Sequence, residues 1–375
     1  MLPRLYNASL DKTTYDSNGL GFIKYCKKCE VTEELNGEYT LSMTVHPRDN
    51  LADKIKVNRI IKAKPNSTDK PQLFEITKHV VKANGEIEIS GQHIKYLCMQ
   101  NCFFRTKIFS ESINGTPQEI IDSLFENLYF DNLFSFKSNI NDTVDFKLTD
   151  ITSKKLGDVF GGSDYSLISE FGGEFFYNNF NIGFLKQRGS NSDFKLMFGK
   201  NLSDFNQTIS NDTCYSHIMA YAKLSKADDN TTVIVCSDPY STNQNQVFPK
   251  VKFIDKTEEI KNHFGSDWKV NPTTGYNMTA TLQQLYHYAY KSFKNDYKSR
   301  TEEEINVTVT HKEILSEMQN LSMGDTIKIC YGEDKQSLSA RIIKTVYNAL
   351  EEKYTSIEVG SPKINLISFI KNKRR

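Results

Sequence analysis

A pattern of alternating apolar and polar residues occurs twice in this chain of 375 residues, once near each end and with matching spacing. Ile60 and Ile327 are 267 residues apart, and so are Ile76 and Ile343, although a loop separates the two positions in each copy. The strands expected around these positions are 56–63, 74–81 and 85–91 in the first copy, and 323–329, 340–347 and 354–360 in the second. Such alternation predicts strands with one buried face and one solvated face. A true duplication predicts two similar β-barrel-like domains, whereas the alternative is two unrelated β-meanders that share short Ile and Val runs by chance.

Two Asn-Gly pairs predict how the strands of the first hundred residues connect. Asn36-Gly37 separates two alternating runs, and Asn84-Gly85 separates two more. Asn-Gly between such runs is the strongest short-range signal for a β-hairpin, because both central residues of the tight turn need positive φ. We therefore expect a hairpin at each pair.

The middle of the chain carries helical signals. Thr116-Pro117-Gln118-Glu119 is typical of a capping box with proline at the first helical position, and an apolar stripe at helical spacing follows it. A second helical stretch is expected from Ser153 to Phe171, ended by Gly172-Gly173, with a hairpin about Asn178-Asn179 after it.

Together these signals predict an α+β, mainly β, protein of three domains. The expected domains are a first β-barrel domain at 1–105, a small α+β domain at 106–193 and a second β-barrel domain at 194–375, which carries a helical insert near 256–303. In that insert, Thr281 and Gln284 predict a capping box that begins a long amphipathic helix. Three copies of such a chain would offer six similar modules to a symmetric partner.

Charge and hydropathy exclude several classes of protein. Lys plus Arg number 47 and Asp plus Glu 46, so the net charge of +1 provides no global field for nucleic acid. The basic stretch 371–375 is interpreted as a solvated end. No run approaches the ~20 apolar residues of a membrane span, and polar residues follow Met1 too soon for a signal peptide. We expect the protein to be made and assembled in a bacterial cytoplasm.

The seven cysteines raise the question of a zinc site. Cys26-x-x-Cys29 and Cys98-x-x-x-Cys102 have metal-like local spacing, but 68 residues separate the two pairs. Cys26 and Cys29 are also an odd number of residues apart in a predicted strand, which would direct their side chains to opposite faces. Free thiols that act as small apolar side chains are therefore the favoured interpretation, and no metal is expected.

No strong catalytic motif is present. The sequence lacks a phosphate loop, a dinucleotide fingerprint and a His-Glu-x-x-His pair, and Gly161-Gly162-Ser163 is better explained as a helix break than as a nucleophile elbow. A Cys–His nucleophile pair stays open, because its members need only be close in space. The acidic stretches 228–230 and 302–304 lack the ligand spacing of a calcium loop. We therefore predict no catalytic, cofactor-binding or metal-binding residues.

Several blocks along the chain resemble the tail-associated, or prophage endopeptidase tail, proteins of phages that infect Gram-positive bacteria of the lactococcal type. The blocks occur in family order and span nearly the whole chain: Cys29–Tyr39, Asp69–Ile76, Gly172–Phe180, Phe198–Leu202 and Ser356–Lys363. The resemblance implies a fold like that of contractile-tail baseplate hub proteins. It also implies a homotrimer that closes the distal end of a long non-contractile tail and gates DNA exit.

The resemblance further implies partners and a location in the virion. The partners would be a hexameric distal tail protein and the end of the tape-measure protein, with receptor-binding proteins of the baseplate as further candidates and phage DNA only in transit. Many family members continue into a peptidase or wall-hydrolase domain, whereas this sequence ends about fifteen residues after 360–363. We therefore expect a structural protein without enzymatic activity. The alternatives are a tail lysin or peptidase, and a module that binds host polysaccharide.

Overall fold

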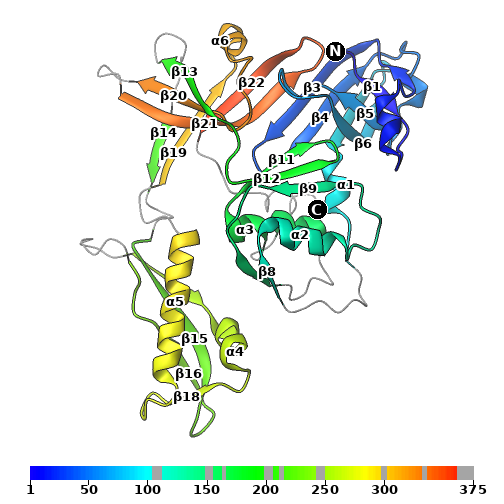
Figure 1. The fold of residues 1–375 in the computed structure, drawn as a ribbon. Coiled ribbons are helices and arrows are strands. Elements are labelled where there is room, and N and C mark those ends of the chain that lie inside the picture. The colour runs from blue at the N-terminus through cyan, green and yellow to red at the C-terminus, as the bar shows by residue number, and fades with distance from the viewer. Residues whose placement is uncertain are drawn as a thin grey trace. The chain divides into compact units, whose positions relative to one another are not determined.

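The fold consists of two compact units. The computed structural model describes residues 1–103, 112–147, 155–162, 166–197, 206–210, 215–241, 250–296, 302–331 and 336–360. Unit 1 comprises Met1–Asn206 and Ile305–Arg375, and unit 2 comprises Gln207–Glu304 (Figure 1). Unit 2 is thus an insertion in the sequence of unit 1, and each unit is described by itself.

The N-terminal part of unit 1 is a module of five antiparallel strands, which we call the N-terminal meander although one pair of neighbouring strands is not consecutive in sequence. Its strands are β3 (Cys26–Glu34), β4 (Tyr39–Val45), β5 (Ile60–Ala63), β6 (Gln72–Val81) and β7 (Ile87–His93). They pair in the order β3-β4-β7-β6-β5, and β1 (Arg4–Tyr6) and β2 (Gly21–Phe22) extend the sheet beyond β5. The pairing of β3 with β4 and of β6 with β7 confirms both predicted hairpins. Only one residue of each Asn-Gly pair has positive φ, Asn36 at 52° and Gly85 at 79°, so the prediction that both turn residues have positive φ was wrong.

The C-terminal part of unit 1 repeats this arrangement. Its strands are β14 (Asn206–Ser210), β19 (Glu302–Val309), β20 (Thr326–Tyr331), β21 (Gln336–Asn348) and β22 (Lys353–Gly360), in the order β14-β19-β22-β21-β20. The division between the units falls within β14, after Asn206, and within β19, before Ile305. A short helix follows the second strand of each meander: the 3₁₀ helix Ala52–Lys54 after β4 and α6 (Lys312–Glu317) after β19. The expected mainly β fold with two similar β modules is confirmed.

Each meander has a β-bulge at an equivalent position, and the two bulges align the meanders residue by residue. They lie between Ile76 and Lys78 in β6 and between Ile342 and Lys344 in β21. This gives an offset of 266 residues, one fewer than the sequence spacing suggested, and pairs such as Ile61 with Phe74 and Ile327 with Ala340 follow the same offset. The predicted offset was wrong by one residue: it paired the buried Ile76 with the half-buried Ile343, whereas the equivalent of Ile76 is the buried Ile342.

The two meanders join into one sheet of 13 strands. The end of β21 pairs antiparallel with β3, from Lys344 opposite Glu34 to Asn348 opposite Glu30. β13 (Asn191–Met197) adds a parallel strand beside β20. Pairing between strands at opposite ends of the chain therefore holds unit 1 together.

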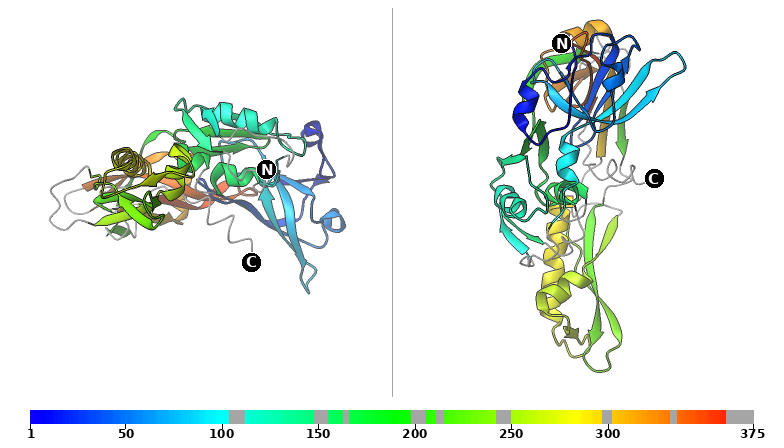
Figure 2. Two further views of the ribbon diagram at one scale, coloured as in Figure 1. Left: turned by 90° about the horizontal axis from the view of Figure 1, so that it is seen from below. Right: turned by 90° about the vertical axis from the view of Figure 1, so that its right-hand side faces the viewer.

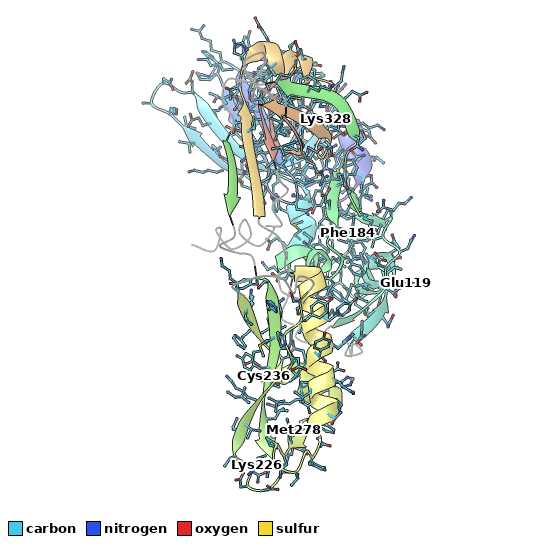
Figure 3. The ribbon with its side chains drawn as sticks, turned by 90° about the vertical axis from the view of Figure 1, so that its left-hand side faces the viewer. Glu119, Phe184, Lys226, Cys236, Met278 and Lys328 are labelled. Carbon is cyan, nitrogen blue, oxygen red and sulfur yellow. The ribbon has the colours of Figure 1, made fainter. Side chains whose placement is uncertain are left out.

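The segment between the meanders forms smaller layers, visible below the large sheet in Figure 1. The elements are α1 (Lys95–Met99), β8 (Ser112–Gly115), α2 (Pro117–Phe125), β9 (Ser135–Ser138), β10 (Val144–Lys147), a π-helical turn (Asp158–Gly162), α3 (Leu167–Phe171), β11 (Glu174–Asn178) and β12 (Asn181–Leu185). The Thr116–Glu119 capping box, the Gly172 helix end and the turn at Asn179 are all confirmed. Phe184, labelled with Glu119 in Figure 3, packs against Phe175 with ring centroids 4.6 Å apart and the rings tilted by 37°.

Unit 2 is a small sheet covered by helices. Its elements are β15 (His217–Lys226), β16 (Thr232–Cys236), β17 (Val251–Asp255), α4 (Thr257–Phe264), β18 (Lys269–Val270) and α5 (Met278–Asp296). α5 contacts the sheet through Leu285 and Ala289, which are buried with Ile218 and Ile260. The capping box predicted at Thr281 was wrong, because α5 begins at Met278 and the Thr281 hydroxyl accepts a hydrogen bond from Trp268. No helix among the described residues is long and apolar enough to cross a membrane.

Candidate functional site

The cysteine and histidine side chains do not gather into a reactive cluster in the described part of the chain, where no group of three or more His, Cys, Asp or Glu residues is placed to hold a metal ion. Of the histidines (46, 79, 93, 217, 263, 287 and 311), His93 is the fully buried one among those described, and it contacts Gln72 and the ring of Tyr39. Cys98 is buried in α1, and Cys102 is partly exposed.

The prediction that Cys26 and Cys29 face opposite sides of a strand was wrong. A β-bulge between Cys26 and Lys28 adds one residue to β3, so Cys26 lies opposite Val45 and Cys29 opposite Met43. Val45 and Met43 are both buried and share the inner face of β4. The neighbouring Cys26 thiol, together with burial, raises the pKa of the Cys29 thiol.

A buried polar site of unit 1 lies where the two meanders meet the segment between them. Arg188, just after β12, is buried, and its Nη1 lies 3.0 Å from Glu33 Oε1 on β3 and 3.2 Å from the carbonyl oxygen of Phe175. The main-chain N–H of Arg188 donates to Glu174 Oε2 at 2.7 Å. One arginine therefore joins the N-terminal meander to β11.

A second arginine joins the same carboxylate to the C-terminal meander. The Arg341 guanidinium on β21 donates to both carboxylate oxygens of Glu174, with Nη2 2.8 Å from Oε2. It also donates to the carbonyl oxygens of Arg188 at 2.8 Å and Gly324 at 3.0 Å. A two-pronged pair of this kind fixes the orientation of the guanidinium relative to the carboxylate as well as their separation, because both groups are planar. We call Glu33, Glu174, Arg188 and Arg341 the junction cluster.

Two glycines let the backbones beside the junction cluster approach closely. Gly189 and Gly324 have φ of 74° and 87°, and a Cβ atom on Gly189 would lie 2.2 Å from the carbonyl carbon of Gly324. The buried Asp325 carboxylate accepts the N–H of Ser190 at 2.7 Å and that of Ser322 at 2.8 Å. This contact holds residues 188–190 against the loop before β20.

The junction cluster was missed in the sequence, although one signal was present. Glu33 lies between Val31 and Leu35 on the buried face of β3, where alternation calls for an apolar residue. A charged residue at such a position is expected to have a buried partner. Its partner Arg188 is 155 residues away in the chain, and no local pattern indicates that pairing.

A buried lysine lies near the junction cluster. Lys95 Nζ donates to the carbonyl oxygen of Gly37 at 2.9 Å and lies 4.2 Å from the ring centroid of Tyr177. Burial lowers the pKa of Lys95 to about 7, and the nearby charge of Arg188 acts in the same direction. Burial also lowers the pKa of His93, whose Nδ1 accepts the N–H of Lys95 at 3.1 Å.

The lowered pKa of Lys95 predicts that this residue contributes more to the stability of unit 1 as the pH rises from 7 towards 10. In that range Lys95 loses its proton in the folded state but keeps it when unfolded, so the unfolded state binds more protons and the free energy of unfolding rises. The contribution is at most about 1.4 kcal/mol per pH unit. Urea unfolding between pH 7 and 9 should show a smaller slope for Lys95→Met. The exposed control Lys353→Met should keep the wild-type slope, and equal slopes for all three proteins would contradict the prediction.

Unit 2 carries a separate hollow. It has a volume of about 580 Å³ and is lined by residues 264–269, which include Trp268, together with Ala227, Tyr276 and Asn277. Trp268 stacks on Phe264 with ring centroids 4.3 Å apart, and Tyr276 is exposed at its edge. The lining offers aromatic surface together with the polar residues Ser266, Asp267 and Lys269.

Comparison with protein-family models finds no match, and comparison with curated proteins finds none. Solved structures do match. Prophage tail protein gp18 from Listeria monocytogenes EGD-e has a TM-score of 0.57 at 13% identity, with coverage of 100% of this chain and 98% of that chain. The 43 kDa tail protein of prophage MuSo2 from Shewanella oneidensis has a TM-score of 0.56 at 10% identity, covering 97% and 99%. A tail protein from Neisseria meningitidis MC58 has a TM-score of 0.52 at 9% identity, covering 98% of each chain. Over nearly its whole length, the chain therefore has the fold of prophage tail proteins.

Proposed function

We propose that the chain is a structural, non-enzymatic hub protein at the tip of a long non-contractile phage tail. The observation that carries the proposal is the shared fold with prophage tail proteins over nearly the full length of both partners. The family blocks in the sequence favour phages of Gram-positive bacteria. In this role the protein closes the distal end of the tail tube and opens it for DNA on host attachment.

The duplicated meander supports a ring assembly. Three copies carry six similar meanders, which match the symmetry of a hexameric distal tail protein. The junction cluster supports a rigid structural role for unit 1, since buried charges with hydrogen-bonded partners hold three segments in one geometry. The tape-measure protein would contact the ring from the tube side, and receptor-binding proteins would attach around it.

The proposal predicts a trimer that binds the distal tail protein. Three chains of 43.0 kDa give a mass of roughly 130 kDa by sedimentation or native mass spectrometry. Mixing with the hexameric distal tail protein should give one complex of three chains to six. A monomer at micromolar concentration with no affinity for that hexamer would overturn the hub. Clearing of host cell walls by the purified protein would instead support the lysin alternative.

A further inference from the structure

Two strands that are equivalent in the duplication differ in their partners. The outer half of β21, from Lys344 to Asn348, pairs with β22 on one edge and with β3 on the other. Thr345 and Tyr347 in this half are buried. In the C-terminal meander, this stretch is therefore an interior part of a sheet.

The equivalent half of β6 lies at an edge. By the offset of 266 residues, 344–348 correspond to 78–82, and in this part β6 pairs with β7 alone among the described strands. Residues 77–81 are all exposed, and Val81 keeps 63% of its surface. Figure 2 shows this hairpin extending away from the rest of unit 1.

The main-chain groups on this edge face outward. The N–H of Lys82 donates to the carbonyl oxygen of Glu86, across the hairpin. Since successive N–H groups of an extended strand point to opposite edges, those of His79 and Val81 point away from β7. A row of such groups is a template for another strand.

A second strand of the duplication lacks the partner that its equivalent has. β3 and β14 are the first strands of their meanders, and β3 pairs with β4 on one edge and β21 on the other. β14 pairs with β19 and then ends the sheet, with no further strand beside it among the described residues. The N-terminal meander thus has a free edge on β6, and the C-terminal meander has a free edge on β14. Their equivalents, β21 and β3, pair with each other within the chain.

We propose that β14 of one copy adds antiparallel to residues 78–82 of the next copy, which are the end of β6 and the residue after it. This contact repeats between chains the β3–β21 pairing within a chain, and it is heterologous, so copies join head to tail. The sequence of β14, Asn-Gln-Thr-Ile-Ser, is uncharged, so it brings no like charge to Lys78 or Lys82. The inference rests on the proposed trimer: three such contacts close a ring of six meanders.

The test removes the main-chain N–H of Val81, which points to the free edge of β6. Val81→Pro removes one donor from the free edge and leaves the β6–β7 hydrogen bonds intact, because proline is tolerated at edge positions. Val81→Ala is the matched control, since it shortens the side chain but keeps the N–H. We expect Val81→Pro to weaken assembly at least 100-fold by sedimentation, with an unchanged circular dichroism spectrum, and Val81→Ala to remain assembled.

Hydrogen exchange of the wild-type protein provides a second measurement that needs no variant. The amides of His79 and Val81, and those of 206–210 that point away from β19, should exchange at least tenfold more slowly in the assembled protein than in the diluted monomer. A wild-type trimer without this protection, or a Val81→Pro protein that assembles like wild type, would overturn the inference and leave the hub proposal standing. A monomeric wild type would overturn both.

Discussion

Replacing Gly189 with alanine is expected to lower the free energy of unfolding of unit 1 by about 4 kcal/mol. The new Cβ would lie 2.2 Å from the carbonyl carbon of Gly324 and 2.3 Å from the nitrogen of Asp325, both of them backbone atoms. Relief requires that the 188–190 segment and the loop before β20 move apart, which would stretch the Asp325–Ser190 hydrogen bond. Urea unfolding followed by circular dichroism measures the loss.

Gly172→Ala provides the control for backbone strain. Gly172 has φ of 66°, close to the 74° of Gly189, but a Cβ atom there meets nothing within 4 Å. This variant should lower the free energy of unfolding by only about 1 kcal/mol, the usual cost of placing a residue other than glycine in the left-handed conformation. The difference between the free energies of unfolding of the two variants measures the contribution of the close backbone contact between Gly189 and Gly324. Equal losses would show that the Gly189–Gly324 contact contributes nothing.

Replacing Arg188 with methionine is expected to lower the free energy of unfolding by about 3–5 kcal/mol, because it leaves a buried carboxylate without its partner. Glu33 has lost nearly all its solvent contact, with 4% of its surface exposed, and the carbonyl oxygen of Phe175 also loses a donor. Thermal and urea unfolding at pH 7 measure the effect. Lys353→Met, which breaks the exposed 2.6 Å ion pair with Glu351, should change stability by less than about 1 kcal/mol.

A double variant separates the lost pair from lost packing. Glu33→Leu combined with Arg188→Met removes both charges and should recover at least about 2 kcal/mol of the loss, since buried ion pairs can be replaced by apolar side chains of similar size. Equal stability of the single and double variants would mean that Arg188 acts through packing, for example through its guanidinium 5.2 Å from the Phe176 ring centroid.

Local structure was predictable wherever the signal lay within a few residues. The turns at Asn36, Gly85 and Asn179 and the cap at Thr116 depend on backbone preferences that neighbours do not alter. The β-bulges were not predictable in this way. A bulge changes which residues share a face, so it moved the repeat offset by one residue and placed Cys26 and Cys29 on the same side.

The junction cluster shows the limit of reading a sequence locally. Glu33 alone signalled a buried charge, whereas Glu174, Arg188 and Arg341 resemble ordinary surface residues in sequence. Their environment depends on contacts between segments that are 153–167 residues apart. The start of α5 was missed for a related reason. The Thr281 hydroxyl accepts a hydrogen bond from Trp268 and does not cap the N-terminus of the helix.

The pairing of β3 with β21 also sets an order of events during synthesis. Residues 30–34 leave the ribosome about 310 residues before their partners 344–348, a delay of about 15–60 s at ordinary elongation rates. Throughout that interval the nascent N-terminal meander can form, but one edge of β3 stays open to other chains. Glu30, Glu33 and Glu34 lie along that edge, and their charge repels a second copy of the same strand. The carboxylates within residues 30–34 are therefore expected to oppose pairing with other chains until β21 has been made.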